Sequence, residues 1–218
     1  MSKLLKALIC FIAFGALGAT AAEAEAAVKF ERITLPSSRE FKEASLGLTN
    51  CKSAFDYRPN IVLALCDDPR NSSKTNFGTR LLLIDTAQSR PTIIFRAPSG
   101  GGDAYSAKLS VFEIESRHLP RVLLLDYGAE FHFGTMVFFQ LNDKLKYVGE
   151  IRWVALSDDN QLASPTGFAE ISGNATGFRI DFSQKLFLPT HDGSIGNARF
   201  VSFSYDSAAG KLVAKTRD

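Results

Sequence analysis

The sequence predicts an all-β protein: an antiparallel meander of about ten to twelve short strands, with one short helix near residues 38–45. Apolar residues occur in short runs, and Gly, Pro, Asn or Asp interrupts these runs about every ten residues, which is the spacing of strands joined by tight turns. Some runs are apolar throughout, whereas others alternate. We therefore expect a sandwich or a truncated propeller-like stack of four-stranded units.

The apolar runs fall into two kinds. Runs without alternation predict strands that are covered on both faces, and they span residues 61–66, 80–84, 92–95, 122–125 and 136–141. Two later segments alternate instead, so each should have one exposed face. Their apolar positions are Phe178, Ile180 and Phe182 in one, and Val201, Phe203 and Tyr205 in the other.

The one convincing helix covers residues 38–45. Pro36 and Ser37 precede Glu40 in a capping-box arrangement, and Gly47 supplies a stop. A helix of this length is not stable alone, so we expect Phe41 to pack against the sheet.

A weak internal repeat suggests how the strands are grouped. The order apolar run, polar loop, Phe-Gly-Thr, apolar run, turn, apolar run occurs twice, with Phe77 and Phe133 separated by 56 residues. Adding strands expected near 46–49 and 108–115 makes each copy a four-stranded unit, and a degraded third copy would span residues 168–213. Chance similarity between meander strands is the alternative interpretation.

The N-terminal segment has the features of a cleaved signal peptide over residues 1–22. Lys3 and Lys6 precede an apolar stretch, and small residues follow it. Only sixteen residues separate Lys6 from Glu23, fewer than the roughly 20 apolar residues that an uncleaved anchor needs. We expect one exported β domain over residues 23–218, periplasmic or extracellular, with no membrane span after cleavage.

Composition narrows the class of partner. Cleavage removes two of the 25 basic residues and so leaves 23 against 23 acidic residues, without a basic run. Nucleic acid is therefore not an expected partner, because phosphate binding needs clustered Lys and Arg. The Gly-rich segment 98–103 lacks the Lys-Ser or Lys-Thr that follows a phosphate-binding loop, and we expect no cofactor and no metal.

Two cysteines, Cys51 and Cys66, remain after cleavage and predict one disulfide in an oxidising compartment. Closing a loop of about 16 residues should stabilise the fold by roughly 3 kcal/mol on the chain-entropy model. A zinc site would need further ligands, and a catalytic dithiol would be expected as Cys-x-x-Cys.

The best candidate for chemistry is the segment that contains Asp126, Glu130 and His132. In an extended chain Glu130 and His132 project to the same side, where a carboxylate and an imidazole could bind a metal or transfer a proton. In the alternative interpretation, Tyr127 and Phe131 pack the strand ends while the polar residues face water.

The sequence favours a non-enzymatic exported β domain that binds another macromolecule, as inhibitors, immunity proteins and envelope-accessory proteins do. The expected partner is a protein in the cell envelope or outside the cell. Its contact surface should combine Tyr127 and Phe131 with Asp67 and Asp68, since their loops occupy equivalent places in the two units. The alternative is a small exported hydrolase using Glu130 and His132, with or without a metal.

Overall fold

The computed structural model describes residues 27–38, 41, 43–68, 79–98, 106–114, 119–129, 132–153, 164–190 and 196–217. Within these ranges the chain is almost entirely antiparallel β-structure, which confirms the predicted fold class. The predicted leader, residues 1–22, lies outside them. The strands are β1 Val28–Ile33, β2 Thr49–Arg58, β3 Ile61–Asp67, β4 Thr79–Asp85, β5 Thr92–Arg96, β6 Ser106–Ile114, β7 Arg121–Ala129, β8 His132–Leu141, β9 Lys144–Trp153, β10 Ala169–Asn174, β11 Gly177–Phe182, β12 Phe200–Asp206 and β13 Leu212–Arg217, and the 3-10 turns are η1 Glu43–Leu46 and η3 Pro165–Phe168.

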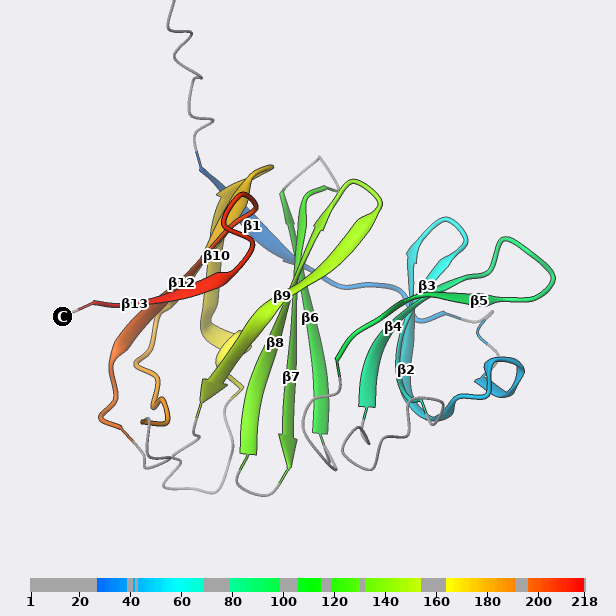
Figure 1. Ribbon diagram of the computed structural model, residues 1–218, viewed down its shortest axis with the longest axis horizontal. Helices are drawn as coiled ribbons and strands as arrows, with labels where there is room; N and C mark the ends of the chain where they lie inside the picture. Colours follow the sequence, from blue (N-terminus) through cyan, green and yellow to red (C-terminus); the bar gives the residue numbers. More distant parts are fainter. Residues whose placement is uncertain are drawn as a thin grey trace, which may run out of the picture.

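Nine strands form one strongly curled sheet in the order β13-β12-β11-β10-β1-β6-β7-β8-β9 (Figure 1). Its two edges approach each other, because a Cβ on Gly149 of β9 would lie only 3.0 Å from Leu212 Cβ of β13. Lys146 Nζ also donates a hydrogen bond to the Tyr205 hydroxyl across this seam, at 3.4 Å. The sheet is therefore nearly closed around its own apolar core. That core includes Phe30, Phe112, Leu124, Phe139, Ile180 and Phe203.

The alternating strands β11 and β12 place their apolar residues in this core. Phe178, Ile180 and Phe182 are buried while Arg179 and Asp181 face outward, as the sequence predicts. The same holds for Val201, Phe203 and Tyr205, although Ser202 between them is also buried.

The other four strands form a second sheet in the order β2-β3-β4-β5, packed on the outer face of β6, β7 and β8 (Figure 1). Strands β3, β4, β7 and β8 are thus buried on both faces, as the continuous apolar runs predict. The core between the sheets includes Leu63, Leu81, Leu123, Leu125 and Phe138.

The strand predicted over residues 92–95 is present as β5, but the prediction that both of its faces are covered is wrong. Strand β5 is the edge of its sheet, and a bulge in its pairing with Leu83 and Ile84 turns Ile94 to the outside, where it is 50% exposed. A continuous apolar run does not reveal a bulge, because the extra residue changes the face of its neighbours without changing the composition.

A third layer covers the far face of the small sheet. Leu46 and Leu48 pack there with Val62 and Leu82, and Phe41 packs against this cluster as predicted. The helical segment is one 3-10 turn, Glu43–Leu46, followed by Gly47 at φ 65°. It begins later than the expected residue 38 because Ser38 N donates to Ala54 O (2.9 Å), which keeps the chain extended along β2.

The N-terminal chain joins the two sheets. Strand β1 lies between β10 and β6, with Phe30 opposite both Ile171 and Ile114. The chain then crosses to the small sheet, where Ser37 forms a bridge with Phe55 of β2. The sequence pattern does not predict this strand.

The predicted grouping into four-stranded units matches the order of the strands. Strands β2–β5 form a complete sheet, and β6–β9 and β10–β13 are consecutive meanders that β1 joins into the larger sheet. The repeat itself stays a prediction. The strand expected near residues 46–49 is wrong in its bounds, because η1 ends at Leu46 and the first strand of this unit is β2, Thr49–Arg58.

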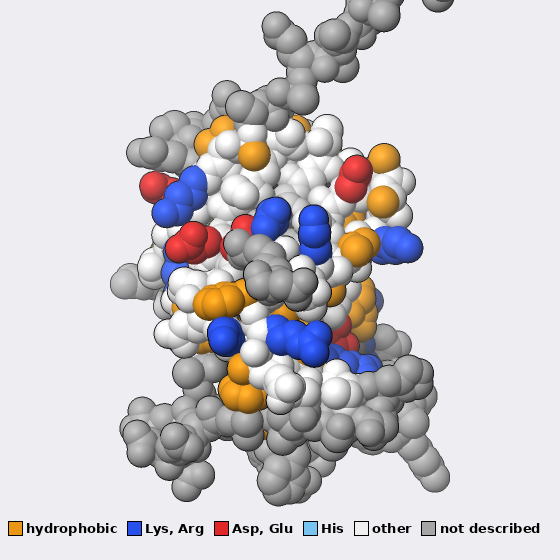
Figure 2. Space-filling model, turned by 90° about the vertical axis from the view of Figure 1, so that its left-hand side faces the viewer, with side chains coloured by type: hydrophobic (Ala, Val, Ile, Leu, Met, Phe, Trp, Pro, Cys, Tyr) orange, Lys and Arg blue, Asp and Glu red, His pale blue; other side chains and the backbone are white. Residues whose placement is uncertain are grey.

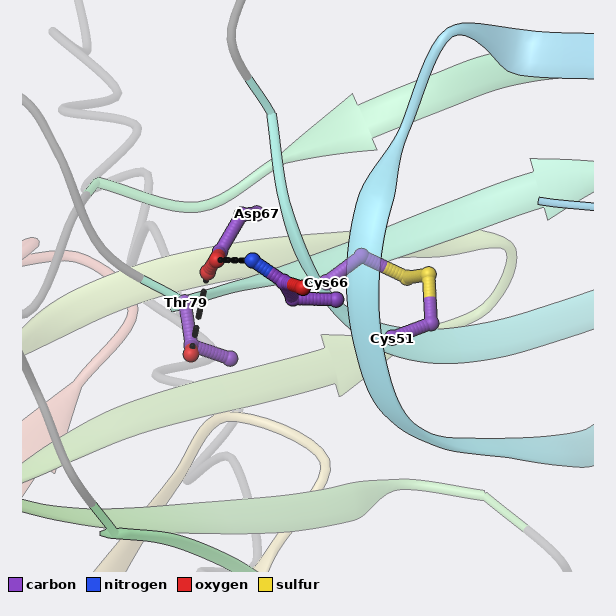
Figure 3. The surroundings of a disulfide bond; sticks show 5 residues. Cys51, Cys66, Asp67 and Thr79 are labelled. Atoms are coloured by element: carbon purple, nitrogen blue, oxygen red, sulfur yellow. Dashed lines mark hydrogen bonds between the residues drawn. A yellow bond between two sulfur atoms is a disulfide. The ribbon is translucent and has the colours of Figure 1, made fainter. Parts of the chain in front are cut away.

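The predicted disulfide between Cys51 and Cys66 is present and connects β2 to β3 (Figure 3). Cys66 is fully buried under the third layer, and Cys51 packs against the same cluster. The crosslink therefore fixes the outer strand of the small sheet to its central strand.

Candidate functional site

A groove opens where the N-terminal chain crosses between the sheets, and we call it the crossover groove. It is lined by residues 32–35, Phe55 and residues 108–111, and encloses about 220 Å³. It therefore has one wall from each sheet. Ligand sites commonly form at such junctions between structural layers.

The groove exists because β1 leaves the larger sheet early. Its last pair with β6 is Ile33 opposite Val111. Strand β6 begins at Ser106, which lies opposite Gly128 of β7. From Ser106 to Ser110, β6 pairs only with β7 among the described residues. Residues 106–110 therefore present an open strand edge beside the groove.

The walls of the groove are apolar and its rim is cationic. Ile33, Leu35 and Leu109 are partly buried and pack against the core between the sheets. Arg32 and Lys108 are exposed at the rim. The position of Arg32 is fixed, since its guanidinium donates to Thr166 O and lies 5.1 Å from the centre of the Phe112 ring.

A buried carboxylate lies behind the groove, on the inner face of the larger sheet. Asp126 is 5% exposed and accepts hydrogen bonds from the hydroxyls of Thr135 (2.5 Å), Thr166 (2.7 Å) and Ser164. The Ser110 hydroxyl donates to Thr166 Oγ1 at 3.5 Å and connects this cluster to the groove. These hydrogen bonds hold η3, which contains Thr166, against Ser110 of β6 and Asp126 of β7.

The environment of Asp126 shifts the pKa of its carboxyl upward. Burial raises the pKa of its carboxyl, because ionisation is costly away from water. Hydrogen bonds from Ser164, Thr135 and Thr166, and the charge of Lys108, act in the opposite direction. Lys108 stands directly opposite Asp126 in the pairing of β6 with β7.

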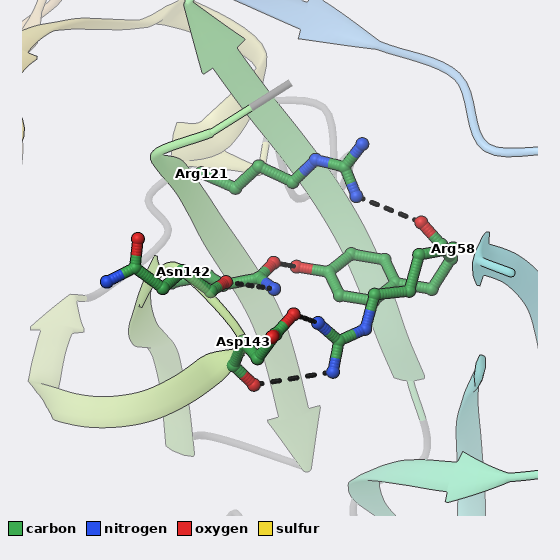
Figure 4. Close-up of polar contacts among 6 residues, drawn as sticks. Arg58, Arg121, Asn142 and Asp143 are labelled. Carbon is green, nitrogen blue, oxygen red and sulfur yellow. Dashed lines mark hydrogen bonds and ion pairs between the residues drawn. The ribbon is translucent and has the colours of Figure 1, made fainter. Parts of the chain in front are cut away.

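A polar clamp sets the distance between the sheets at the other end of the shared core (Figure 4). The Tyr57 hydroxyl donates to Gln140 Oε1, and Arg121 donates to the Tyr57 carbonyl at 3.0 Å. Arg58 pairs with Asp143 in the turn between β8 and β9. Burial raises the pKa of Tyr57 to about 12, so its hydroxyl remains a donor at neutral pH.

The structure places two of the sequence-predicted residues of the β7–β8 segment on opposite faces of the larger sheet. Asp126 faces the inner core, whereas Tyr127 lies on the outer face, over Gly134, and donates to Glu150. Burial, with the adjacent Glu150 carboxylate, raises the pKa of Tyr127. Glu130, Phe131 and the side chain of His132 lie outside the described residues; the backbone of His132 is opposite Ala129.

The two acidic candidates near the disulfide are held within the chain. Asp67 accepts hydrogen bonds from Asn50 (2.9 Å) and Thr79 (3.3 Å), which ties the ends of β2, β3 and β4 together (Figure 3). Asp68 is buried and forms an ion pair with Arg96 at 2.7 Å. Both carboxylates therefore have a structural role at the end of the small sheet. The loop that follows them, residues 69–78, lies outside the described residues.

Two other surfaces of the described residues carry hollows or exposed apolar side chains. A wider hollow of about 800 Å³ surrounds the turn between β2 and β3, where Thr86 N donates to Asn60 O at 2.8 Å. The outer face of β10–β13, seen in Figure 2, exposes Phe200 (41%) and Val213 (48%) near Lys215. It serves below as the control surface.

Sequence reasoning missed Lys108, Ser164 and Thr166 as neighbours of Asp126. Thr166 is 40 residues away in the chain and belongs to a 3-10 turn without a recognisable motif. Of these three residues, only Lys108 could have been predicted from the sequence. The strands that contain Lys108 and Asp126 are expected to be adjacent, and the register of such a hairpin determines which residues lie opposite each other.

Among the described residues, no three or more His, Cys, Asp or Glu side chains are grouped so as to hold a metal ion. In the same part of the chain, no helix has the length and hydropathy required to cross a membrane. Comparison of the chain with protein-family models, curated proteins and solved structures found no match.

Proposed function

We propose that this protein is an exported, non-enzymatic β domain that binds another protein, and that the crossover groove holds the partner. The observation that carries the proposal is the open edge of β6 beside an apolar hollow with a cationic rim. Apolar walls supply binding free energy, while a few polar groups determine orientation.

The chemistry of the Asp126 cluster supports binding over catalysis. A catalytic carboxylate must reach the substrate, yet Asp126 is buried and its two oxygens accept three hydroxyl hydrogen bonds. This arrangement stabilises the floor of the groove and holds η3 in place.

Export is supported by the leader-like residues 1–22 and by the disulfide, since such crosslinks form and persist in oxidising compartments. The expected partner is therefore a protein of the cell envelope or the exterior. Interaction with nucleic acid is not proposed, because the predicted mature chain carries balanced charge.

The test is site-specific photo-crosslinking in the full-length chain expressed in its own host. A photoreactive residue replaces Thr34 in the groove or, as a control, Ser204 on the outer face of β12. We expect one reproducible protein adduct from position 34 and none of the same mass from position 204. Equal adducts from both positions, or none from position 34, would refute the proposal.

A charge-neutralising pair then tests the rim. Lys108→Gln should weaken binding of the crosslinked partner about tenfold, whereas Lys215→Gln on the control face should leave it unchanged. Equal effects of the two substitutions would argue against the groove.

A further inference from the structure

The open stretch of β6 has a defined geometry. In an antiparallel ladder, each residue directs its N–H and C=O to one side, and successive residues alternate. Residues 106–110 use one side for β7 and have no strand on the other among the described residues. Every second residue there thus directs an N–H and a C=O to a side on which the described part of the chain provides no strand partner.

The direction of an incoming segment follows from β1. Strand β1 runs antiparallel to β6 and ends its pairing at Ile33 opposite Val111. A segment that paired with residues 110 to 106 would run in the same direction as β1 and occupy the line that β1 leaves. It would complete the ladder without displacing a described strand.

The side chains specify the segment further. Lys108 lies on the inner face at this edge, and Arg32 is nearby on the rim, so an acidic residue fits opposite Lys108. Leu109 faces the core between the sheets, so the residue opposite it should be apolar. A hollow of about 220 Å³ is smaller than the roughly 300–1,000 Å³ of small-molecule sites, which suits a partner's side chain.

From these observations we infer that the partner is an extended peptide segment that adds to residues 106–110 of β6 as an antiparallel strand, with an acidic residue opposite Lys108 and an apolar residue opposite Leu109. This inference rests on the proposed function and specifies its binding mode. Main-chain hydrogen bonds supply affinity in such strand addition, and alternate side chains supply specificity.

The test uses a blocked synthetic peptide with the core Thr-Leu-Glu-Val-Thr, whose Glu aligns with Lys108 and whose Leu aligns with Leu109. Amide hydrogen exchange of the full chain is followed by NMR with and without the peptide. We expect alternate amides of residues 106–110 to exchange at least about tenfold more slowly when the peptide is bound. The intervening amides, already bonded to β7, serve as internal controls.

Variants of the peptide and of the chain test the alignment. A peptide with Lys in place of Glu should bind about tenfold more weakly to the natural chain. Lys108→Gln should reduce that difference between the peptides, whereas Lys215→Gln should preserve it. A peptide N-methylated at the residues that face the open amides should not slow exchange.

The opposing outcomes are distinct. Slow exchange of all five amides without peptide would show that another part of this chain covers the edge. Protection that grows with protein concentration would indicate that a second copy of the chain binds the edge. Absence of peptide binding would show that the edge does not accept an acidic strand. Each of these results overturns the inference. If position 34 crosslinks a partner that leaves the edge amides unprotected, strand addition is wrong while the proposed function stands.

Discussion

The polar clamp between the sheets permits a sharp test through Tyr57→Phe. The substitution keeps the ring, which packs in the core between the sheets, and keeps the backbone carbonyl that accepts from Arg121 at 3.0 Å. It removes only the hydroxyl that donates to Gln140 Oε1. Gln140 is 1% exposed, so water cannot readily replace the lost donor.

The expected loss in free energy of unfolding is about 1–3 kcal/mol, the usual cost of leaving one buried acceptor without a donor. Adding Gln140→Leu removes that acceptor, so the double variant should lose less than the sum of the single losses, with a coupling of at least about 0.5 kcal/mol. Urea unfolding, followed by tryptophan fluorescence and circular dichroism, measures all four corners of the cycle.

Tyr147→Phe is the matched control. Tyr147 also packs on Phe138, with ring centres 5.7 Å apart, but it is only partly buried. Its loss should stay within about 0.5 kcal/mol, as for other substitutions away from buried polar pairs. Equal losses for Tyr57→Phe and Tyr147→Phe, or strict additivity in the cycle, would refute the argument for the clamp.

Three further predictions follow from the structure. For Asp126, burial raises the folded-state pKa above the unfolded value of about 4. As pH rises above about 4, the folded chain therefore binds more protons than the unfolded chain and loses stability. The free energy of unfolding of Asp126→Asn, measured in urea, should rise relative to that of the natural chain as pH increases above about 4, and parallel curves would contradict this. Gly134→Ala places a Cβ 2.4 Å from the Tyr127 hydroxyl and should cost about 1–3 kcal/mol, while Gly167→Ala, with open space around it, should cost no more than about 1 kcal/mol. Replacing Cys51 and Cys66 by Ala should lower stability by about 3 kcal/mol, and a reductant should then have no further effect on the unfolding midpoint.

Much of the strand pattern could be predicted because the positions at which a strand is buried are occupied by apolar residues. Strand β7 is apolar at every position from Val122 to Leu125, since Leu124 faces the core of the curled sheet and Leu123 faces the small sheet. Strand β11 alternates because only one of its faces is covered. Such local rules determine which residues form strands and how many layers cover them.

The pairing of distant strands could not be predicted in the same way. Strand β1 contains Lys29, Glu31 and Arg32, so it does not read as a strand, and its partners lie far along the chain, as Phe30 does from Ile171. Nothing in its local sequence specifies those partners. The groove was missed for this reason, because its opening depends on where β1 stops pairing with β6.

The position of Asp126 could not be predicted, for a related reason. The sequence predicts residues 126–134 as one loop, whereas β7 continues to Ala129 and β8 begins at His132; the Glu130–His132 pair stays a prediction, because Glu130 and the side chain of His132 lie outside the described residues. The continued alternation of β7 places Asp126 and Tyr127 on opposite faces of the sheet. A strand that extends into an expected loop thus fixes the face of the sheet on which each of these two side chains lies.

The groove and the clamp are consequences of one connection. The N-terminal chain cannot both continue along β6 and reach β2, so joining the sheets leaves residues 106–110 without a strand on that side in the part of the chain that the structure describes. The clamp at Tyr57 then fixes how far apart the two walls stand. If this coupling holds, Tyr57→Phe should weaken peptide binding at the groove although Tyr57 does not line it, whereas Tyr147→Phe should not. Unchanged affinity in Tyr57→Phe would mean that the groove is shaped by the crossing chain alone.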